Sequence, residues 1–92
     1  CLICGHVGLA GSVTVGDRVV LGGKTGVADH LNIGADSVLA GGSLVGTHVP
    51  PGSVMMGAPA VPRDLARRQF MALRRLPAMV EQLRELRARL GL

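Results

Sequence analysis

The sequence predicts a mainly β fold, a parallel β-helix of hexapeptide repeats, followed by a C-terminal α-helical extension. Three observations lead to this prediction. An aliphatic residue recurs at every sixth position through the first half of the chain. Glycine occurs 14 times, almost always in that half, which indicates frequent tight turns. Phe70 is the only aromatic residue although 48% of the chain is hydrophobic, so the core must be aliphatic.

The repeat is counted from Ile3, and each of its eight sixth positions is aliphatic. The residue after each of them is Gly, Ala or Cys. An even period suits short strands with alternating faces and does not suit a helix of 3.6 residues per turn. The pattern resembles the left-handed triangular β-helix, in which three hexapeptides make one coil. So few coils are expected to need further coils, partner chains or both. The eight positions are Ile3, Leu9, Val15, Leu21, Val27, Ile33, Leu39 and Val45.

The three histidines share one repeat position, a corner where side chains turn outward. His30 and His48 are 18 residues apart, so a regular coil would stack them about 4.8 Å apart, with His6 on a neighbouring edge. Spacing alone leaves open a base, an oxyanion donor, a metal ligand shared between subunits, or a solvated side chain. Cys1 and Cys4 form a C-x-x-C pair without a second pair, and we interpret them as structural.

The end of the chain predicts a helical extension. Four prolines between residues 50 and 62 interrupt the strand pattern. A helix is predicted from Asp64, as N-cap or first-turn acid, to about Leu76, and Pro77 interrupts it or begins a second helix that ends at Gly91. The second helix carries an a/d seam that packs on its own chain or on copies of itself around an oligomer axis. The seam comprises Leu76, Met79, Leu83, Leu86 and Leu90.

Charge divides the chain in the same way. Residues 1–58, the predicted β-helix, carry two basic and three acidic side chains, a net charge of −1. Residues 59–92, the predicted extension, carry eight arginines and three acids, a net charge of +5, which favours an acidic partner. The near absence of aromatic residues argues against base-stacking nucleic-acid modules and aromatic-belted membrane spans. We therefore expect no nucleic acid and no membrane span.

Four segments resemble one enzyme family. Residues 4–12 and 26–34 are similar to two coils of its β-helix, the second with a G-x-x-x-H-x-x-I-G pattern around His30. The exit Gly57-Ala58-Pro59-Ala60 and the helix segment Leu73-Arg74-Arg75-Leu76-Pro77 match its C-terminal end. Together they resemble the C-terminal part of UDP-3-O-(3-hydroxyacyl)glucosamine N-acyltransferase, a lipid A biosynthesis family, over essentially all 92 residues.

The resemblance implies a homotrimer with active sites in clefts between neighbouring prisms. Such enzymes transfer a 3-hydroxyacyl group from acyl carrier protein to the 2-amino group of a UDP-linked 3-O-acylglucosamine. His30 matches the histidine that supports the oxyanion, and Gly42, Ser43 and Leu44 match the region lining the acyl chain. The general base belongs to an Ala-His-Asn motif expected upstream of Cys1, so the 92 residues alone are expected to be inactive.

The resemblance further implies that Arg74 and Arg75 help to dock acyl carrier protein. No metal or cofactor is expected beyond the phosphopantetheine thioester of that donor, and the location is expected to be the cytoplasm of a Gram-negative bacterium. Two alternatives stay open: a metal-using hexapeptide enzyme of the gamma carbonic anhydrase kind, and a non-catalytic trimeric scaffold or binding module.

Overall fold

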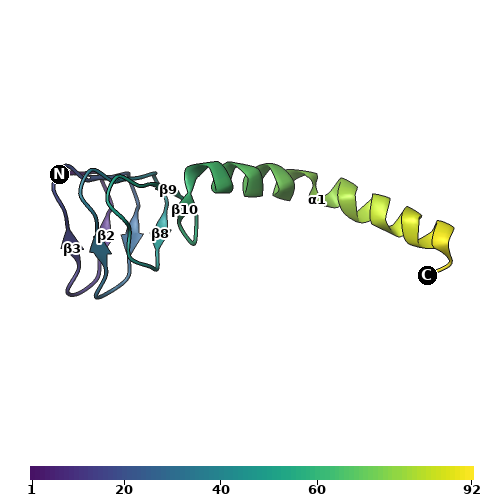
Figure 1. Cartoon of the computed structure of the whole chain (residues 1–92), viewed down its shortest axis with the longest axis horizontal. Helices are drawn as coiled ribbons and strands as arrows, with labels where there is room; N and C mark the ends of the chain where they lie inside the picture. The colour runs from purple at the N-terminus through teal and green to yellow at the C-terminus, as the bar shows by residue number, and fades with distance from the viewer.

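A computed structural model describes residues 1–92 and contains a triangular β-helix from which one long helix projects (Figure 1). The molecule measures 57 × 23 × 19 Å along its principal axes. The elements are β1 (Leu2–Ile3), β2 (Gly8–Leu9), β3 (Thr14–Val15), β4 (Val20–Leu21), β5 (Gly26–Val27), β6 (Asn32–Ile33), β7 (Val38–Leu39), β8 (Leu44–Val45), β9 (Val54–Met56), β10 (Val61–Pro62) and α1 (Arg63–Leu90).

The strands form three parallel faces, and each of the first two coils occupies 18 residues. Leu2 pairs with Val20, and Val20 pairs with Val38, so equivalent residues are separated by three hexapeptides. The faces are β1-β4-β7-β9, β2-β5-β8 and β3-β6, and β10 adds to the first face antiparallel to β9. The predicted β-helix of hexapeptide repeats with a helical extension is confirmed.

The core contains the aliphatic residues of the repeat from Leu21 to Val45, whereas Ile3 and Leu9 in the first coil are exposed. Leu21 and Leu39 are fully buried and Ile33 is 2% exposed, because every sixth side chain points into the prism. Three small polar residues, Thr25, Ser37 and Ser43, are also fully buried. Their hydroxyls donate to backbone carbonyls, so no buried side-chain polar atom lacks a hydrogen-bond partner.

Each corner depends on a residue in the left-handed backbone conformation. His6, Ser12, Arg18, Lys24, His30 and Asp36 all have φ between 56° and 62°, at intervals of six residues. The corners of successive coils are tied by hydrogen bonds: the amide of His30 donates to the carbonyl of Gly11 at 3.0 Å. His6 and His30 therefore lie at exposed left-handed corners, as the spacing predicts, whereas His48 is exposed without the left-handed conformation.

The third coil is two residues shorter than the others. Ile33 pairs with Val49 and Val38 with Val54, both separations of 16 residues. This shift places His48 beside Asn32 rather than beside His30. The predicted stacking of His30 on His48 is therefore wrong, because the corner between β8 and Val49 lacks two residues of the regular repeat.

Helix α1 is continuous from Arg63 to Leu90, so the predicted interruption at Pro77 is also wrong. Pro77 removes one backbone donor from the helix interior, and the helix axis changes direction about halfway along (Figure 1). Pro62 is the N-cap residue, and Asp64 lies in the first turn as one of the two predicted possibilities. Gly91, at φ 73°, ends the helix as predicted.

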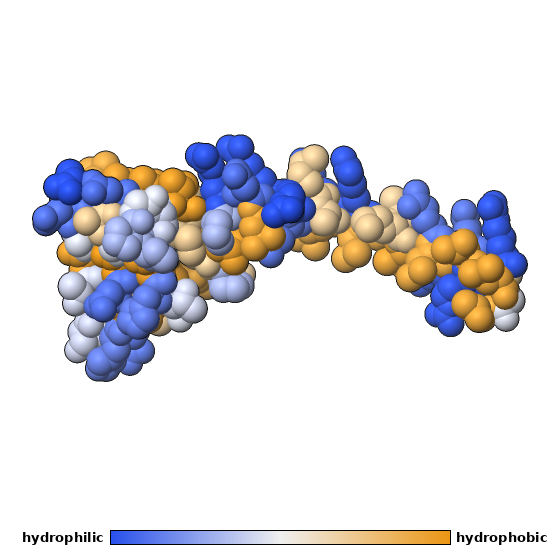
Figure 2. All heavy atoms as spheres, in the orientation of Figure 1, coloured by the Kyte–Doolittle hydropathy of each residue, from blue (hydrophilic) through white to orange (hydrophobic).

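The helix begins four residues after the boundary predicted from composition, because residues 61–62 first form β10 against β9. Ala66 is its only buried residue, and it packs on the end of the prism. Most of the helix surface is exposed, with apolar side chains gathered along one side of the projecting part (Figure 2). No helix combines the length and the apolarity of a membrane span.

Candidate active site

A shallow apolar groove of about 740 Å³ runs across the face formed by β2, β5 and β8. Its floor is smooth because Gly8 and Gly26 occupy the same strand position in two successive coils. Leu44 occupies this position in the third coil, and its Cδ2 atom lies 3.1 Å from where a Cβ on Gly26 would be. The side chain of Leu44 thus lies over Gly26, and a Cβ at position 26 would require it to move by a few tenths of an ångström.

The loop of residues 57–60 forms one margin of this groove. The amide of Leu44 donates to the carbonyl of Gly57 at 2.9 Å, and the amide of Ala60 donates to the carbonyl of Leu44 at 2.8 Å. These two bonds continue the ladder beyond β8 and hold Ala58 and Pro59 against the groove. An apolar chain lying in the groove would contact aliphatic atoms along its length.

His30 lies at the corner that follows the groove strands. Its ring Nδ1 lies 3.2 Å from Oδ2 of Asp29, and the two side chains are 76% and 69% exposed. No backbone group of the third coil donates to the carbonyl of Asp29, although equivalent carbonyls such as those of Gly11 and Gly23 each accept an amide. The short third coil therefore leaves the His30 corner uncovered on that side.

The contact with Asp29 determines which proton the His30 ring carries. An ionised carboxylate only accepts hydrogen bonds, so the proton of this contact must be on Nδ1. In the neutral ring Nε2 is then an acceptor, whereas in the doubly protonated ring Nε2–H is a donor. His30 can thus donate a hydrogen bond to an oxyanion from Nε2 only when both ring nitrogens carry protons.

Of the three residues predicted to line the acyl chain, two lie at the groove and one is buried inside the prism. Leu44 lines the groove, and Gly42 is an exposed corner residue at φ 74° next to it. Ser43 is fully buried, and its hydroxyl donates to the carbonyl of Ala40 inside the prism. The structure thus brings His30, Gly42 and Leu44 around one face and directs the Ser43 side chain away from it.

Arg74 and Arg75 lie on α1, about 17 Å along the helix axis from Arg63. They are exposed and belong to a helix whose basic side chains project mainly from the side opposite its apolar residues (Figure 2). Their part of the helix lies beyond the last coil (Figure 1), so they are separate from the His30 corner.

The groove is not lined by His48, Cys1 or Cys4. His48 accepts a hydrogen bond at Nδ1 from the amide of Asn32 at 3.0 Å. Cys1 and Cys4 are both free thiols, and Cys1 Sγ donates to the carbonyl of Gly16 at 3.1 Å. Sequence reasoning missed Asp29 and the closing Ala58-Pro59 loop. A carboxylate immediately before a corner histidine was the available signal for Asp29.

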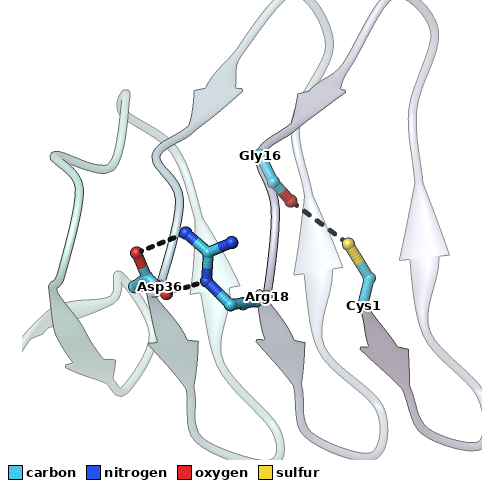
Figure 3. A network of polar contacts seen from close by, with 4 residues as sticks. All are labelled: Cys1, Gly16, Arg18 and Asp36. Carbon is cyan, nitrogen blue, oxygen red and sulfur yellow. Dashed lines mark hydrogen bonds and ion pairs between the residues drawn. The ribbon is translucent and has the colours of Figure 1, made fainter.

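A third corner carries an ion pair between successive coils (Figure 3). Arg18 donates from Nε to Oδ1 of Asp36 at 2.6 Å and from Nη2 to Oδ2 at 3.1 Å. The hydrogen bond from Arg18 holds the pKa of the Asp36 carboxyl below its usual value, and the same bond raises the pKa of Arg18. Both side chains are more than half exposed, so this bidentate pair adds modestly to the stacking of the coils.

The chain is similar to several curated proteins. It is 45% identical over 78 residues, 85% of the chain, to the UDP-3-O-acylglucosamine N-acyltransferase of Methylobacterium sp. (strain 4-46). The identity is 49% over 76 residues, 83% of the chain, to the enzyme of that name from Methylorubrum extorquens (strain PA1). A probable mitochondrial UDP-3-O-acylglucosamine N-acyltransferase 2 of Arabidopsis thaliana is 45% identical over 71 residues, 77% of the chain. The chain spans about a fifth of the length of these relatives.

A solved structure agrees with the fold. The crystal structure of PerB from Caulobacter crescentus, in complex with CoA and GDP-perosamine, matches with a TM-score of 0.67 and 33% identity. The match covers 68% of this chain and 30% of that one. A mutant of the GDP-perosamine N-acetyl transferase of the same organism matches equally well. No protein-family model matches the chain.

The fold and these similarities define the class that the chain resembles, because its coils of six-residue repeats match a segment of an N-acetyltransferase of known structure. Within that class, the relatives of 45 to 49% identity are UDP-3-O-acylglucosamine N-acyltransferases. The resemblance to this family predicted from the motifs around His30, Pro59 and Pro77 is confirmed.

Proposed function

We propose that the protein transfers a 3-hydroxyacyl group from acyl carrier protein to the 2-amino group of a UDP-linked 3-O-acylglucosamine, in lipid A biosynthesis. The observation that carries the proposal is the uncovered His30 corner beside an apolar groove, in a chain similar to N-acyltransferases. A hydrogen-bond donor near the edge of an apolar groove suits a reaction at the carbonyl carbon of a fatty acyl chain that lies in the groove.

The reaction forms one C–N bond and breaks one C–S bond. The 2-amino nitrogen attacks the thioester carbonyl and loses a proton to a base in a part of the enzyme outside these 92 residues. The oxyanion of the tetrahedral intermediate accepts a hydrogen bond from Nε2–H of His30, while Nδ1–H of the same ring donates to Asp29. Collapse of the intermediate forms the amide and releases the carrier thiolate, which takes up a proton. A preorganised oxyanion donor contributes about 3 kcal/mol to lowering such a barrier.

His30→Ala in the intact enzyme tests this assignment, with His6→Ala as the matched control. Both histidines occupy the same repeat position with φ 59°, but His6 lies on a corner that precedes the groove strands. We expect His30→Ala to lower kcat about 100-fold with little change in KM, because the donor acts mainly in the transition state. Equal kcat values for the two variants would remove His30 from the mechanism.

The acyl donor is proposed to dock on α1. Acyl carrier protein is acidic, and Arg74 and Arg75 belong to a segment with a net charge of +5. Replacing both with alanine should raise KM for the carrier protein several-fold, and more at low than at high salt. Arg87→Ala with Arg89→Ala removes the same charge at the far end of the helix and serves as control. A KM unchanged by the Arg74 and Arg75 replacements refutes the docking site.

The enzyme is proposed to be a homotrimer acting in the cytoplasm. The apolar seam predicted at residues 76–90 is exposed in the single chain, with Leu83 58% and Leu86 53% exposed, and it lacks any covering element of its own chain. Three such helices around one axis would bury these side chains together. Light scattering of the intact enzyme should give three times the chain mass, and a monomer mass at micromolar concentration would contradict the proposal.

A further inference from the structure

We propose that His48 is a positioning residue, whose imidazole replaces a missing backbone hydrogen-bond acceptor and thereby holds the corner that presents His30. The inference rests on the proposed function, since it assigns His48 the role of positioning the His30 corner for the proposed reaction. It depends on one contact, between the amide of Asn32 and Nδ1 of His48, and on the shortened third coil in which that contact occurs.

The regular ladder shows what is missing at this corner. Where the first and second coils stack, the amide of Thr14 donates to the carbonyl of Leu31 at 3.0 Å. Asn32 is the equivalent of Thr14 one coil further, but the two-residue shortening leaves no backbone carbonyl of the third coil to accept its amide. Nδ1 of His48 accepts it instead, at 3.0 Å. The His48 side chain thus supplies the acceptor of a coil-to-coil hydrogen bond that a backbone carbonyl supplies elsewhere.

The shortening also explains why His30 needs this support. Coil-to-coil bonds join the corners at Gly11 and His30 and at Gly23 and Gly42, but no amide reaches the carbonyl of Asp29 from the third coil. Because this hydrogen bond is missing, the His30 corner is open to a substrate and is bonded only to the preceding coil. The His48 contact lies two residues after His30 and restores one tie to the following coil.

Asn32 is held from both directions by this arrangement. Its carbonyl accepts the amide of Val49 at 2.9 Å while its own amide donates to His48. Residues 48 and 49 together therefore clamp the peptide groups at the start of β6. Because only Leu31 separates Asn32 from His30, movement of Asn32 would tilt the corner and redirect the His30 ring. An error of about 1 Å in the position of a catalytic group is enough to lower a rate substantially.

The acceptor role makes a specific demand on the side chain at position 48. Nδ1 must keep its lone pair, so the ring proton lies on Nε2. Asparagine can meet the same demand, because its Oδ1 is attached to Cγ as Nδ1 is and only accepts hydrogen bonds. Alanine cannot. His48→Asn is therefore the conservative variant, His48→Ala the disruptive one, and His6→Ala the control for losing a corner histidine.

The test measures the intact enzyme and both variants in two ways. Hydrogen exchange of the Asn32 amide reports the contact itself, and kcat and KM report its effect on the reaction. We expect His48→Ala to exchange about fivefold faster at Asn32, the effect of losing one hydrogen bond, and to lower kcat about fivefold at unchanged KM. His48→Asn should restore both quantities, and His6→Ala should change neither. Should His48→Ala fail to fold, ring ¹⁵N shifts of the unmodified enzyme must show Nδ1 bare and Nε2 protonated.

The outcomes separate this inference from the proposed function. Unchanged exchange at Asn32 in His48→Ala, or a protonated Nδ1 in the unmodified enzyme, would show that the contact is not made. Faster exchange with unchanged kcat would show that the contact is structural only, and either result overturns the positioning role. If His30→Ala leaves kcat unchanged, the proposed function fails first. A fall in kcat that His48→Asn rescues, while KM and the His6→Ala variant stay unchanged, establishes the role.

Discussion

Gly22→Ala tests the view that the small residue after each inward aliphatic is required by the stacking of coils. A Cβ placed on Gly22 would lie 2.5 Å from the backbone nitrogen of Gly41 and 2.8 Å from its Cα. Ordinary contact begins at 3.4 Å, so the two coils would have to separate by about 0.9 Å at this point. Neither group is a flexible side chain that could turn away.

The cost follows from the same geometry. The amide of Gly22 donates to the carbonyl of Leu39 at 2.8 Å, and a separation of 0.9 Å would stretch this bond to about 3.7 Å, beyond hydrogen-bond range. Loss of one neutral hydrogen bond costs about 1 kcal/mol, and overpacking adds roughly 1–3 kcal/mol. The lower entropy of the unfolded alanine chain offsets about 0.5 kcal/mol. We therefore expect Gly22→Ala to lower the free energy of unfolding by about 1.5–3.5 kcal/mol.

Gly46→Ala is the matched control. Gly46 has the same position in the repeat, its φ is not positive, and no atom lies within 4 Å of where its Cβ would be. Urea unfolding followed by far-UV circular dichroism should show a lower midpoint for Gly22→Ala at an unchanged slope, and a change within about 0.5 kcal/mol for Gly46→Ala. Equal midpoints for the two variants would refute the reasoning, because only at Gly22 does the added Cβ meet backbone atoms of the next coil.

Three further predictions concern single side chains. Arg18 lowers the pKa of Asp36, so the pair stabilises the fold above the usual carboxyl value of 3.8 and this stabilisation is lost as pH falls through the lowered pKa. Asp36→Asn should thus slightly lower Tm at pH 7 and leave it unchanged at about pH 2, and an equal decrease at both would refute the electrostatic origin. Asp29→Asn should lower kcat about threefold, because a neutral amide oxygen accepts a weaker hydrogen bond from the His30 ring than a carboxylate does, whereas an unchanged kcat would show that this contact does not affect catalysis. Leu44→Ala should shift kcat/KM about tenfold toward acyl donors two carbons longer, and an unchanged chain-length preference would place the acyl chain elsewhere.

The regular part of the fold could be predicted because the repeat is enforced by burial. Every sixth residue from Leu21 to Val45 had to be aliphatic to fill the core, and the corners from His6 to Asp36 recur every six residues. The shortened coil could not be predicted in this way. A regular register would pair Ile33 with Pro51, 18 residues later, but Ile33 pairs with Val49 instead. Val49 already fits the repeat as an aliphatic residue four positions after Val45, so the pattern alone does not reveal the shorter corner.

The candidate site was predictable to the extent that it follows from the repeat and the family motifs. His30 and Leu44 belong to corners and strands whose positions the period determines. The contacts of Asp29 and His48 depend on how the shortened third coil packs against the second coil. A pattern of single residues does not predict this packing. Pro77 misled the prediction because losing one backbone donor bends a long helix without ending it, when strong helix formers such as Ala and Leu flank the proline.

The product of the reaction tests the central claim most directly. The intact enzyme is incubated with a 3-hydroxyacyl carrier protein and UDP-3-O-acylglucosamine, and the nucleotide sugar is analysed by mass spectrometry before and after mild alkaline hydrolysis. The proposed function predicts a sugar heavier by one 3-hydroxyacyl group that resists alkali as an amide, and a rate about 100-fold lower with His30→Ala. A sugar of unchanged mass, or an alkali-labile ester formed equally fast without His30, would contradict it.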